Sequence, residues 1–406
     1  MLASIRALFR QPVPIPIEHR RNIRLLYADI AFWGILNGSI IVFLAVYASR
    51  LGASPLQTGL LTASPALMNL IFTFPASNFS RGRPSHKVTR WSALITRAFY
   101  GLLVPLPFLM EAQAQIWTII AVSLVMNVTG TVAAVIGNVF FAETVPVEVR
   151  GQVVGNRNAL LALTTMVTTF TVGQILKYMS FKEGYQVIFL LGFLGAMASV
   201  AMLFLVRPVE TGAPPAPLPK TGLRLDILKT RYNRVLLAMF AYHLAVFLPN
   251  PIFPLYQVNE LLMTDQVISY GGSIFWIFYF IGSTQGGSIS RRLGFKRMTG
   301  VGVVMVAAAT LLFTFSYEPW LYYSMQTFNG IGWAIVGSGL INYVLEFAPP
   351  DDRPAHLAWF NLVANLAVLI CGLIAAPVGN SLGLFGAMLL AVAVRFLAGF
   401  AILKWG

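Results

Sequence analysis

Ionisable side chains inside long apolar stretches are the residues of this chain best suited to chemistry. Asp29 is the only carboxylate clearly within such a stretch. A carboxyl group in a poorly solvated cavity can take up and release a proton, because burial disfavours its charged form. The alternative is that Asp29, only about 7–10 Å into its helix, pairs with the basic tail that ends at Arg24. Asp29 is therefore a candidate for proton coupling.

His243 is the second candidate for proton coupling. It follows Arg234 by nine residues, which places it roughly 13 Å along a helix and close to mid-membrane. An imidazole titrates in the physiological range and can also donate to a substrate. A core histidine packed beside Tyr242 is the alternative that the sequence leaves open.

Three prolines follow His243 in the same apolar stretch. Prolines remove backbone donors, so they should bend or break the outer end of this helix. We expect an extracellular gate hinge at Pro249, Pro251 and Pro254.

Neutral polar side chains within the apolar stretches are candidates for lining a substrate cavity. Amides and an indole can hydrogen bond to a weakly polar ligand between apolar walls. Hydrogen bonds that only hold helices together are the competing explanation. The candidates are Asn37, Asn127, Asn138, Asn329, Trp333 and Asn342.

The composition is that of an integral membrane protein, with 57% hydrophobic and 10% charged residues. The net charge of +14 does not indicate nucleic-acid binding, because nearly all charges lie between apolar runs. One cysteine, Cys371, and four scattered histidines predict neither disulfides nor a metal site. No phosphate-binding loop or dinucleotide fingerprint occurs. We therefore expect no enzyme activity and no cofactor, and any work must come from a gradient.

Apolar segments long enough to cross a bilayer occur twelve times, six in each half of the chain. Residues 1–24 form a tail, 25–206 and 234–406 two six-helix bundles, and 207–233 a Pro-rich, basic linker. The spans lie near 25–49, 58–79, 90–110, 114–142, 153–177, 184–206, 234–257, 268–290, 297–315, 320–346, 355–378 and 382–403.

Lysines and arginines divide unequally between the two sides of these spans. One side carries 23 of them and the other carries three. The side with 23 includes both termini, the linker and the loop between spans 4 and 5, with which Arg150 and Arg157 are counted. Positively charged loops stay in the cytoplasm, so both termini and the linker are expected there. Arg97 and Arg395 fall within spans, and we expect them to extend to the cytoplasmic surface.

Two charged loops repeat at an offset of 203 residues, half the length of the chain. Glu143 and Arg150 in the first correspond to Glu346 and Arg353 in the second, and both loops contain proline. This pattern predicts that the chain is an internal duplication of one structural unit. A further loop reads Gly287-Ser288-Ile289-Ser290-Arg291-Arg292-Leu293-Gly294-Phe295-Lys296-Arg297.

These features together resemble the major facilitator superfamily over essentially the whole chain. The last loop is similar to the family's loop between helices 8 and 9, with Arg292 and Gly294 at matching positions. Pro146 and Arg150 match the loop after helix 4. The resemblance implies a cavity between the halves lined by helices 1, 4, 7 and 10, with helices 3, 6, 9 and 12 outside. In that family such loops interlock across the cytoplasmic face, so we expect a cytoplasmic gate at Glu143, Arg150, Arg292, Gly294, Glu346 and Arg353. Glu143 and Glu346 supply its acids in place of the family's loop aspartates, and charges that only mark the water boundary are the alternative.

We therefore expect a monomeric secondary transporter of the plasma (inner) membrane that works by alternating access. A cavity with few charges suits an amphiphilic or weakly polar small organic solute. Proton-coupled export is the expected mode, and facilitated diffusion is its nearest variant. A membrane assembly factor of the same shape, without transport, is the alternative class.

Overall fold

The computed structural model describes residues 17–80, 82–207, 224–349 and 352–405 as a helical protein. In the N-terminal half, the first crossing combines three elements without a break, and the third crossing also has three parts. The elements are α2 (Ile17–Leu36), η1 (Asn37–Ile41), α3 (Val42–Arg50), α4 (Pro55–Phe79), α5 (Ser85–Ala98), η2 (Phe99–Leu103), α6 (Leu106–Leu109), α7 (Ala112–Thr144), α8 (Val147–Tyr178) and α9 (Phe181–Leu205).

The C-terminal half has the same number of crossings, distributed over fewer and longer elements. Its elements are η3 (Leu225–Lys229), α10 (Tyr232–Phe247), α11 (Phe253–Leu255), η4 (Tyr256–Glu260), α12 (Asp265–Thr314), α13 (Pro319–Glu346) and α14 (Arg353–Trp405). The Pro-rich part of the expected linker, 208–223, lies outside the described residues.

Two of these helices each make two crossings. At 1.5 Å per residue, the 50 residues of α12 would extend about 75 Å, more than twice the hydrocarbon thickness of a bilayer. The chain reverses instead at Gly294 and Gly383, whose φ angles are +72° and +68°. Such angles favour glycine because it has no Cβ. With these two reversals, the described part of the chain makes the twelve crossings that the sequence predicts.

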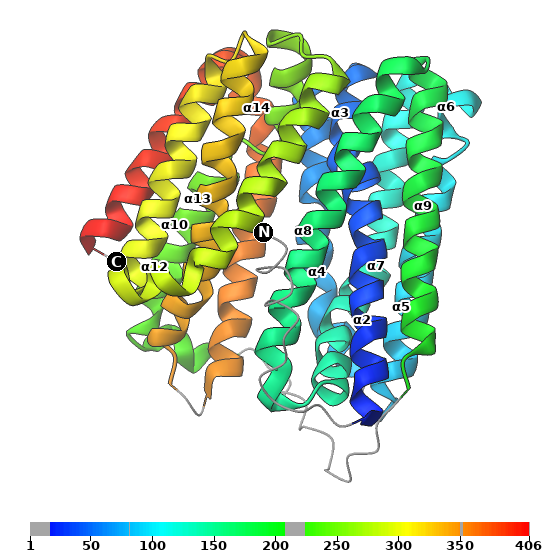
Figure 1. Ribbon diagram of the computed structural model, residues 1–406. Coiled ribbons are helices and arrows are strands. Elements are labelled where there is room, and N and C mark those ends of the chain that lie inside the picture. The colour runs from blue at the N-terminus through cyan, green and yellow to red at the C-terminus, as the bar shows by residue number, and fades with distance from the viewer. Residues whose placement is uncertain (1–16, 81, 208–223, 350–351, 406) are drawn as a thin grey trace.

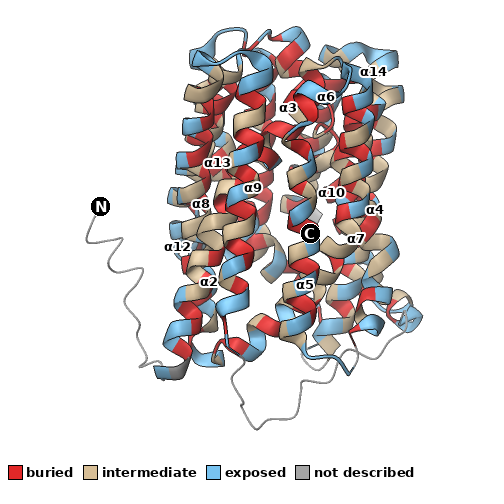
Figure 2. Cartoon of the chain, turned by 90° about the vertical axis from the view of Figure 1, so that its right-hand side faces the viewer, coloured by how far each residue is buried: buried red, intermediate tan, exposed pale blue. Residues whose placement is uncertain are grey.

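Eight helices of the described chain are long and apolar enough to cross a membrane. Figure 2 shows the buried residues inside the bundles and the exposed ones on their outer surface. Many exposed side chains are large and apolar, for example Leu194 (55%), Leu237 (61%) and Leu397 (68%). A surface this apolar is compatible with lipid and not with water.

The two halves lie side by side in Figure 1, and two pairs of long helices make most of the contacts between them. α8 packs against α12, and α4 packs against α14. We call the side with Arg207 and Leu225–Lys229 the linker face, and the side with Leu51–Ser54 and Leu261–Thr264 the opposite face.

The described polar contacts between the halves lie towards the opposite face or midway through the helices. Arg50 and Asp265 form an ion pair of 3.0 Å, and Tyr185 donates to the same carboxylate at 3.1 Å. The Ser273 hydroxyl donates to the Met166 carbonyl at 3.2 Å. The halves are therefore closed against each other on this side.

Candidate functional site

A cavity of about 700 Å³ lies within the N-terminal half. Of its 24 lining residues, Asn250 alone comes from the C-terminal half. The others come from α2, η1, α3, α4, α5, η2, α7 and α8. The resemblance implies a cavity between the halves with helix 3 outside it, whereas this cavity lies within one half and Ala93, Thr96, Arg97 and Tyr100 of helix 3 line it.

Asp29 lies at the cavity wall, in the centre of a buried charged cluster. Its Oδ1 accepts a hydrogen bond of 2.6 Å from the Ser199 hydroxyl. Its Oδ2 accepts one of 3.3 Å from Nη2 of Arg157, and Nη2 of Arg97 lies 3.6 Å from Oδ1. Asp29 is only 3% exposed. Its described ion pairs are with these two arginines rather than with the basic tail.

Arg97 does not extend to the membrane surface, so that expectation is wrong. The residue is 9% exposed, and its guanidinium lies 4.8 Å from the ring of Trp33. Ion pairing with Asp29 makes burial less costly than an isolated charge would be. Arg157 was assigned to a surface loop, but it lies in α8 and lines the same cavity.

Hydrogen-bonding capacity is left over in this cluster. Nη1 of Arg97 and Nε of Arg157 are buried and have no hydrogen-bond partner among the described residues. Buried donors are normally paired, and each unpaired one costs about 1–3 kcal/mol. The cluster therefore holds two cations, one anion and unpaired donors beside an open cavity.

Amides form the polar part of the cavity wall. Asn127, a sequence candidate, lines the cavity and donates to the Ser123 carbonyl at 2.7 Å. Asn69 lines it too, accepts from Thr131 at 2.9 Å and donates to Asn365 of the other half at 3.3 Å. Nothing in the sequence pattern distinguished Asn69 from other amides in the spans.

His243 lies away from this cavity. Its Nδ1 is 2.7 Å from the carbonyl oxygen of Met239, one turn earlier in α10. The ring packs against Tyr242, Phe247 and Phe360 at centroid distances of 4.8, 5.9 and 5.5 Å. Of the two candidates for proton coupling, Asp29 is thus the one that lines the cavity.

The remaining polar candidates lie in several places. Asn37 donates to Thr165 at 3.2 Å, which links helices 1 and 5. Asn329 lines a smaller cavity of about 180 Å³ in the C-terminal half. Trp333 packs against Phe247, Asn342 donates to the Ser338 carbonyl, and Asn138 is exposed.

The six residues of the expected cytoplasmic gate lie at the linker face. Glu143 accepts a hydrogen bond from Ser85, and Arg150 donates to the carbonyls of Ala142 and Val145 at the end of α7. Arg292 and Gly294 lie at the reversal of α12, Glu346 ends α13, and Arg353 begins α14. Among the described residues, none of the six makes a polar contact with the other half.

Helix 7 is interrupted where the three prolines occur. α10 ends at Phe247, and helix resumes at Phe253. Arg395, 1% exposed, donates to the carbonyl of Val246 just before this break and to the Thr310 hydroxyl. The expectation that Arg395 extends to the membrane surface is therefore wrong.

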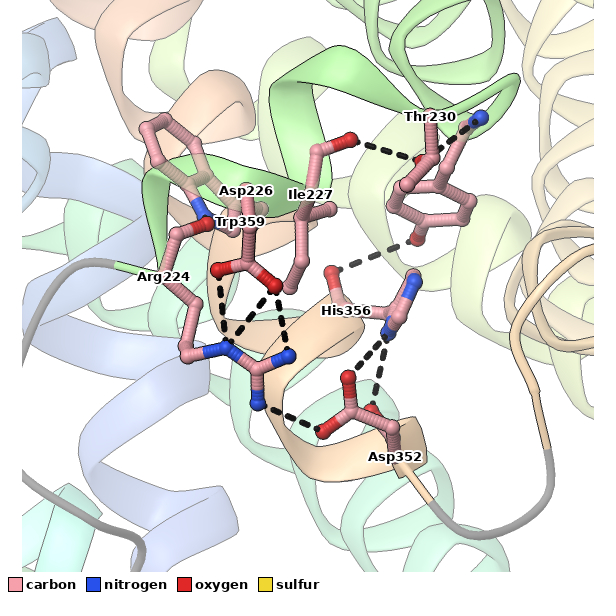
Figure 3. Close-up of polar contacts among 8 residues, drawn as sticks. Arg224, Asp226, Ile227, Thr230, Asp352, His356 and Trp359 are labelled. Carbon is pink, nitrogen blue, oxygen red and sulfur yellow. Dashed lines mark hydrogen bonds and ion pairs between the residues drawn. The ribbon is translucent and has the colours of Figure 1, made fainter.

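A second charged cluster holds the end of the linker on the C-terminal half (Figure 3). Arg224 forms ion pairs with Asp226 at 2.7 Å and with Asp352 at 3.4 Å. The Trp359 indole donates to the Arg224 carbonyl at 3.0 Å. Asp352 also lies 3.5 Å from His356. This cluster joins η3 to the start of α14, and it lies outside the cavity.

Comparisons with known proteins agree with this architecture. The family model for the Major Facilitator Superfamily matches residues 30–242 and again 235–405. The chain belongs to the Major Facilitator Superfamily. The two matches together span nearly the whole chain, as expected for a duplicated unit of this superfamily. No curated protein sequence matches the chain.

Solved transporters share the fold at low sequence identity. A mutant form of the nucleoside transporter NupG is 14% identical, with 94% of this chain and 99% of that one covered at a TM-score of 0.73. A bacterial homologue of the iron transporter ferroportin, in an inward-facing state, is 13% identical, with 95% and 98% covered at 0.73. A D-xylose–proton symporter is 14% identical, with 96% of each chain covered at 0.67. The chain is therefore a multi-pass membrane protein with the fold of a transporter.

Proposed function

We propose that this chain is a secondary transporter that moves an amphiphilic small organic solute across the plasma (inner) membrane. The cavity beside Asp29 is the observation that carries this proposal. Its volume of about 700 Å³ and its mixture of apolar walls with a few polar groups suit such a solute. The structurally similar transporters carry different solutes, so they support the function class but do not identify the solute. The solute class is inferred from the cavity instead.

We place the linker face in the cytoplasm and treat the transporter as a monomer. The excess of lysine and arginine in the loops of that face supports this orientation. Residues 25–206 and 234–406 then move as the two domains of alternating access, joined by 207–233.

The contacts between the halves support a state that opens towards the linker face. Closure on the opposite face includes the Arg50–Asp265 ion pair. In the alternate state, the gate residues Glu143, Arg150, Arg292, Gly294, Glu346 and Arg353 would meet across the linker face. The interrupted helix at Pro249, Pro251 and Pro254 is the proposed hinge on the opposite face.

We assign proton coupling to Asp29 because it is buried and lines the cavity. Its ion pairs with Arg97 and Arg157 favour the charged carboxylate, and they link its protonation to the state of both arginines. Protonation of Asp29 would release Arg97 and Arg157 from their ion pairs. Export in exchange for protons, the direction expected from the sequence, follows if protonation also releases the solute. Uptake together with protons follows if protonation strengthens solute binding.

Proteoliposomes with an imposed pH gradient test this function. We expect solute flux that depends on the gradient in the wild type, and loss of that dependence in Asp29→Asn with the fold intact. His243→Phe is the matched control, because it removes a titratable group outside the cavity and should keep the dependence. Wild-type pH dependence in Asp29→Asn would end the coupling proposal. Flux of no solute under any gradient would favour the assembly-factor alternative.

A further inference from the structure

The charges around the main cavity do not balance. Two guanidinium groups, of Arg97 and Arg157, line it together with a single carboxylate, of Asp29. No other ionisable acid or base except the Tyr100 phenol is among the lining residues. A buried cation without a counterion is costly. The cavity therefore has room, electrostatically, for one more negative charge.

Arg97 has donor capacity for that charge. Its Nη1 is buried and has no hydrogen-bond partner among the described residues, while Nη2 is used by Asp29. A guanidinium is a planar fork that binds oxyanions through two parallel hydrogen bonds. The Trp33 ring lies 4.8 Å from this group and stabilises its positive charge.

The remainder of the cavity suits an apolar body attached to an acidic group. Ile30, Leu44, Leu61 and Met126 line it as apolar walls, and Trp33 adds an aromatic face. An acid with no apolar part would leave these walls in contact with water. We therefore propose that the solute is an amphiphilic organic monoanion, whose carboxylate or similar oxyanion binds Arg97. The inference that this site recognises a transported substrate rests on the proposed transport function.

Protonation of Asp29 should strengthen binding of such a solute. Asp29 faces Arg97 on α5, Arg157 on α8 and the Ser199 hydroxyl on α9. Tyr100 on η2 interacts in turn with Arg97, and Tyr27 on α2 interacts with Arg157. A neutral Asp29 leaves both guanidinium groups without their counterion, so an anion binds more tightly. Proton and solute then occupy the cavity together, which favours uptake rather than the export expected from the sequence.

Binding to purified protein in lipid nanodiscs tests the inference without transport. The probes are 4-phenylbutyrate, its uncharged amide and 4-phenylbutylamine, which share one apolar body. We expect the acid to bind at least about tenfold more tightly than the amide, because a hydrogen bond between two charged groups is stronger than one to a neutral amide. Arg97→Gln should abolish this preference. Arg90→Gln is the matched control, because Arg90 lies on the same helix and donates to the backbone carbonyls of Leu203 and Val206 at the C-terminal end of α9.

Asp29→Asn gives the test a gain of binding that a merely structural role would not produce. This variant removes the anion and should bind the acid more tightly than the wild type at neutral pH. If Arg97→Gln does not fold, the binding affinity of Asp29→Asn for the acid tests the inference by itself.

Wild-type protein without a preference for the acid, or weaker acid binding by folded Asp29→Asn, would overturn the inference. Acid preference without flux in proteoliposomes would leave this site standing and remove the transport proposal. Flux of a solute without acid preference would do the reverse.

Discussion

Arg50 and Asp265 form an ion pair of 3.0 Å that joins the end of α3 to the start of α12. The side chains are 23% and 14% exposed, so water screens the pair only in part. We expect Arg50→Ala to shift the population towards separation of the halves on the opposite face, by about five- to thirtyfold for a loss of 1–2 kcal/mol. Distances between spin labels across that face would measure the shift. Lys182→Ala, an exposed cation on the same face, should leave the distances unchanged.

Gly59 and Gly372 allow α4 and α14 to meet at backbone distance. A Cβ on Gly59 would lie 2.0 Å from the carbonyl oxygen of Gly372, which is far inside van der Waals contact. Gly59→Ala should therefore separate the halves and reduce flux at least tenfold, which corresponds to about 1.4 kcal/mol. Gly155→Ala, in open space on α8, is the control and should keep the flux. Wild-type flux in Gly59→Ala would show that this contact is not needed for closure.

Arg395 satisfies a carbonyl at the break in helix 7. Replacing it with methionine keeps much of its volume but leaves the Val246 carbonyl without that donor. We expect a loss of about 1–3 kcal/mol in the free energy of unfolding, as for an unsatisfied buried acceptor. Thermal unfolding in detergent measures this loss, and Arg395→Lys should be intermediate. A more stable methionine variant would mean that the cost of burying the charge dominates.

Asp226 holds the guanidinium of Arg224, which also pairs with Asp352 just before α14, so the attachment of η3 to α14 should depend on pH. Hydrogen bonds from Arg224 hold the pKa of the Asp226 carboxyl below its usual value. A carboxyl with a lowered pKa stabilises the folded arrangement above its unfolded pKa, and this contribution is lost as pH falls through the folded pKa. We expect η3 to stay attached at neutral pH and to detach once the pH falls below the ordinary aspartate pKa of about 3.9.

The indole N–H signal of Trp359 is the measurement for this prediction, since it donates to the Arg224 carbonyl. Asp352 and His356 belong to the same cluster, so Asp226→Asn is needed to assign the change. That variant should weaken the attachment at neutral pH and reduce the acid transition. A wild-type signal that stays constant well below the ordinary aspartate pKa would contradict the prediction.

Most of the fold could be predicted from the sequence, because bilayer thickness sets the length of each span and the repeat relates the halves. The charged cluster could not be predicted in the same way. Arg97 lies 68 residues from Asp29 along the chain, and only the packing of α2 against its neighbours brings them together. The snorkelling rule places an isolated arginine at the surface, and it failed because Arg97 has a buried acid as its partner.

Asp29 and Asn127 could be recognised because a polar residue at membrane depth is costly wherever it points. Arg157 was missed for a different reason. It lies near the predicted start of its span, where a charge normally marks the water boundary, but α8 begins at Val147 and carries it inward. Which amides face the cavity depends on helix rotation, and a repeat in the sequence contains little information on rotation.

The main cavity belongs almost entirely to one half of the molecule, with Asn250 as the sole described contribution from the other. A solute bound there would move together with the N-terminal bundle, while the movement of the C-terminal bundle would open and close the access routes to it. Apart from the charge on Asp29, the solute's contacts with the protein would then be nearly the same in both states, so the energy difference between the two faces would come from the gradients across the membrane.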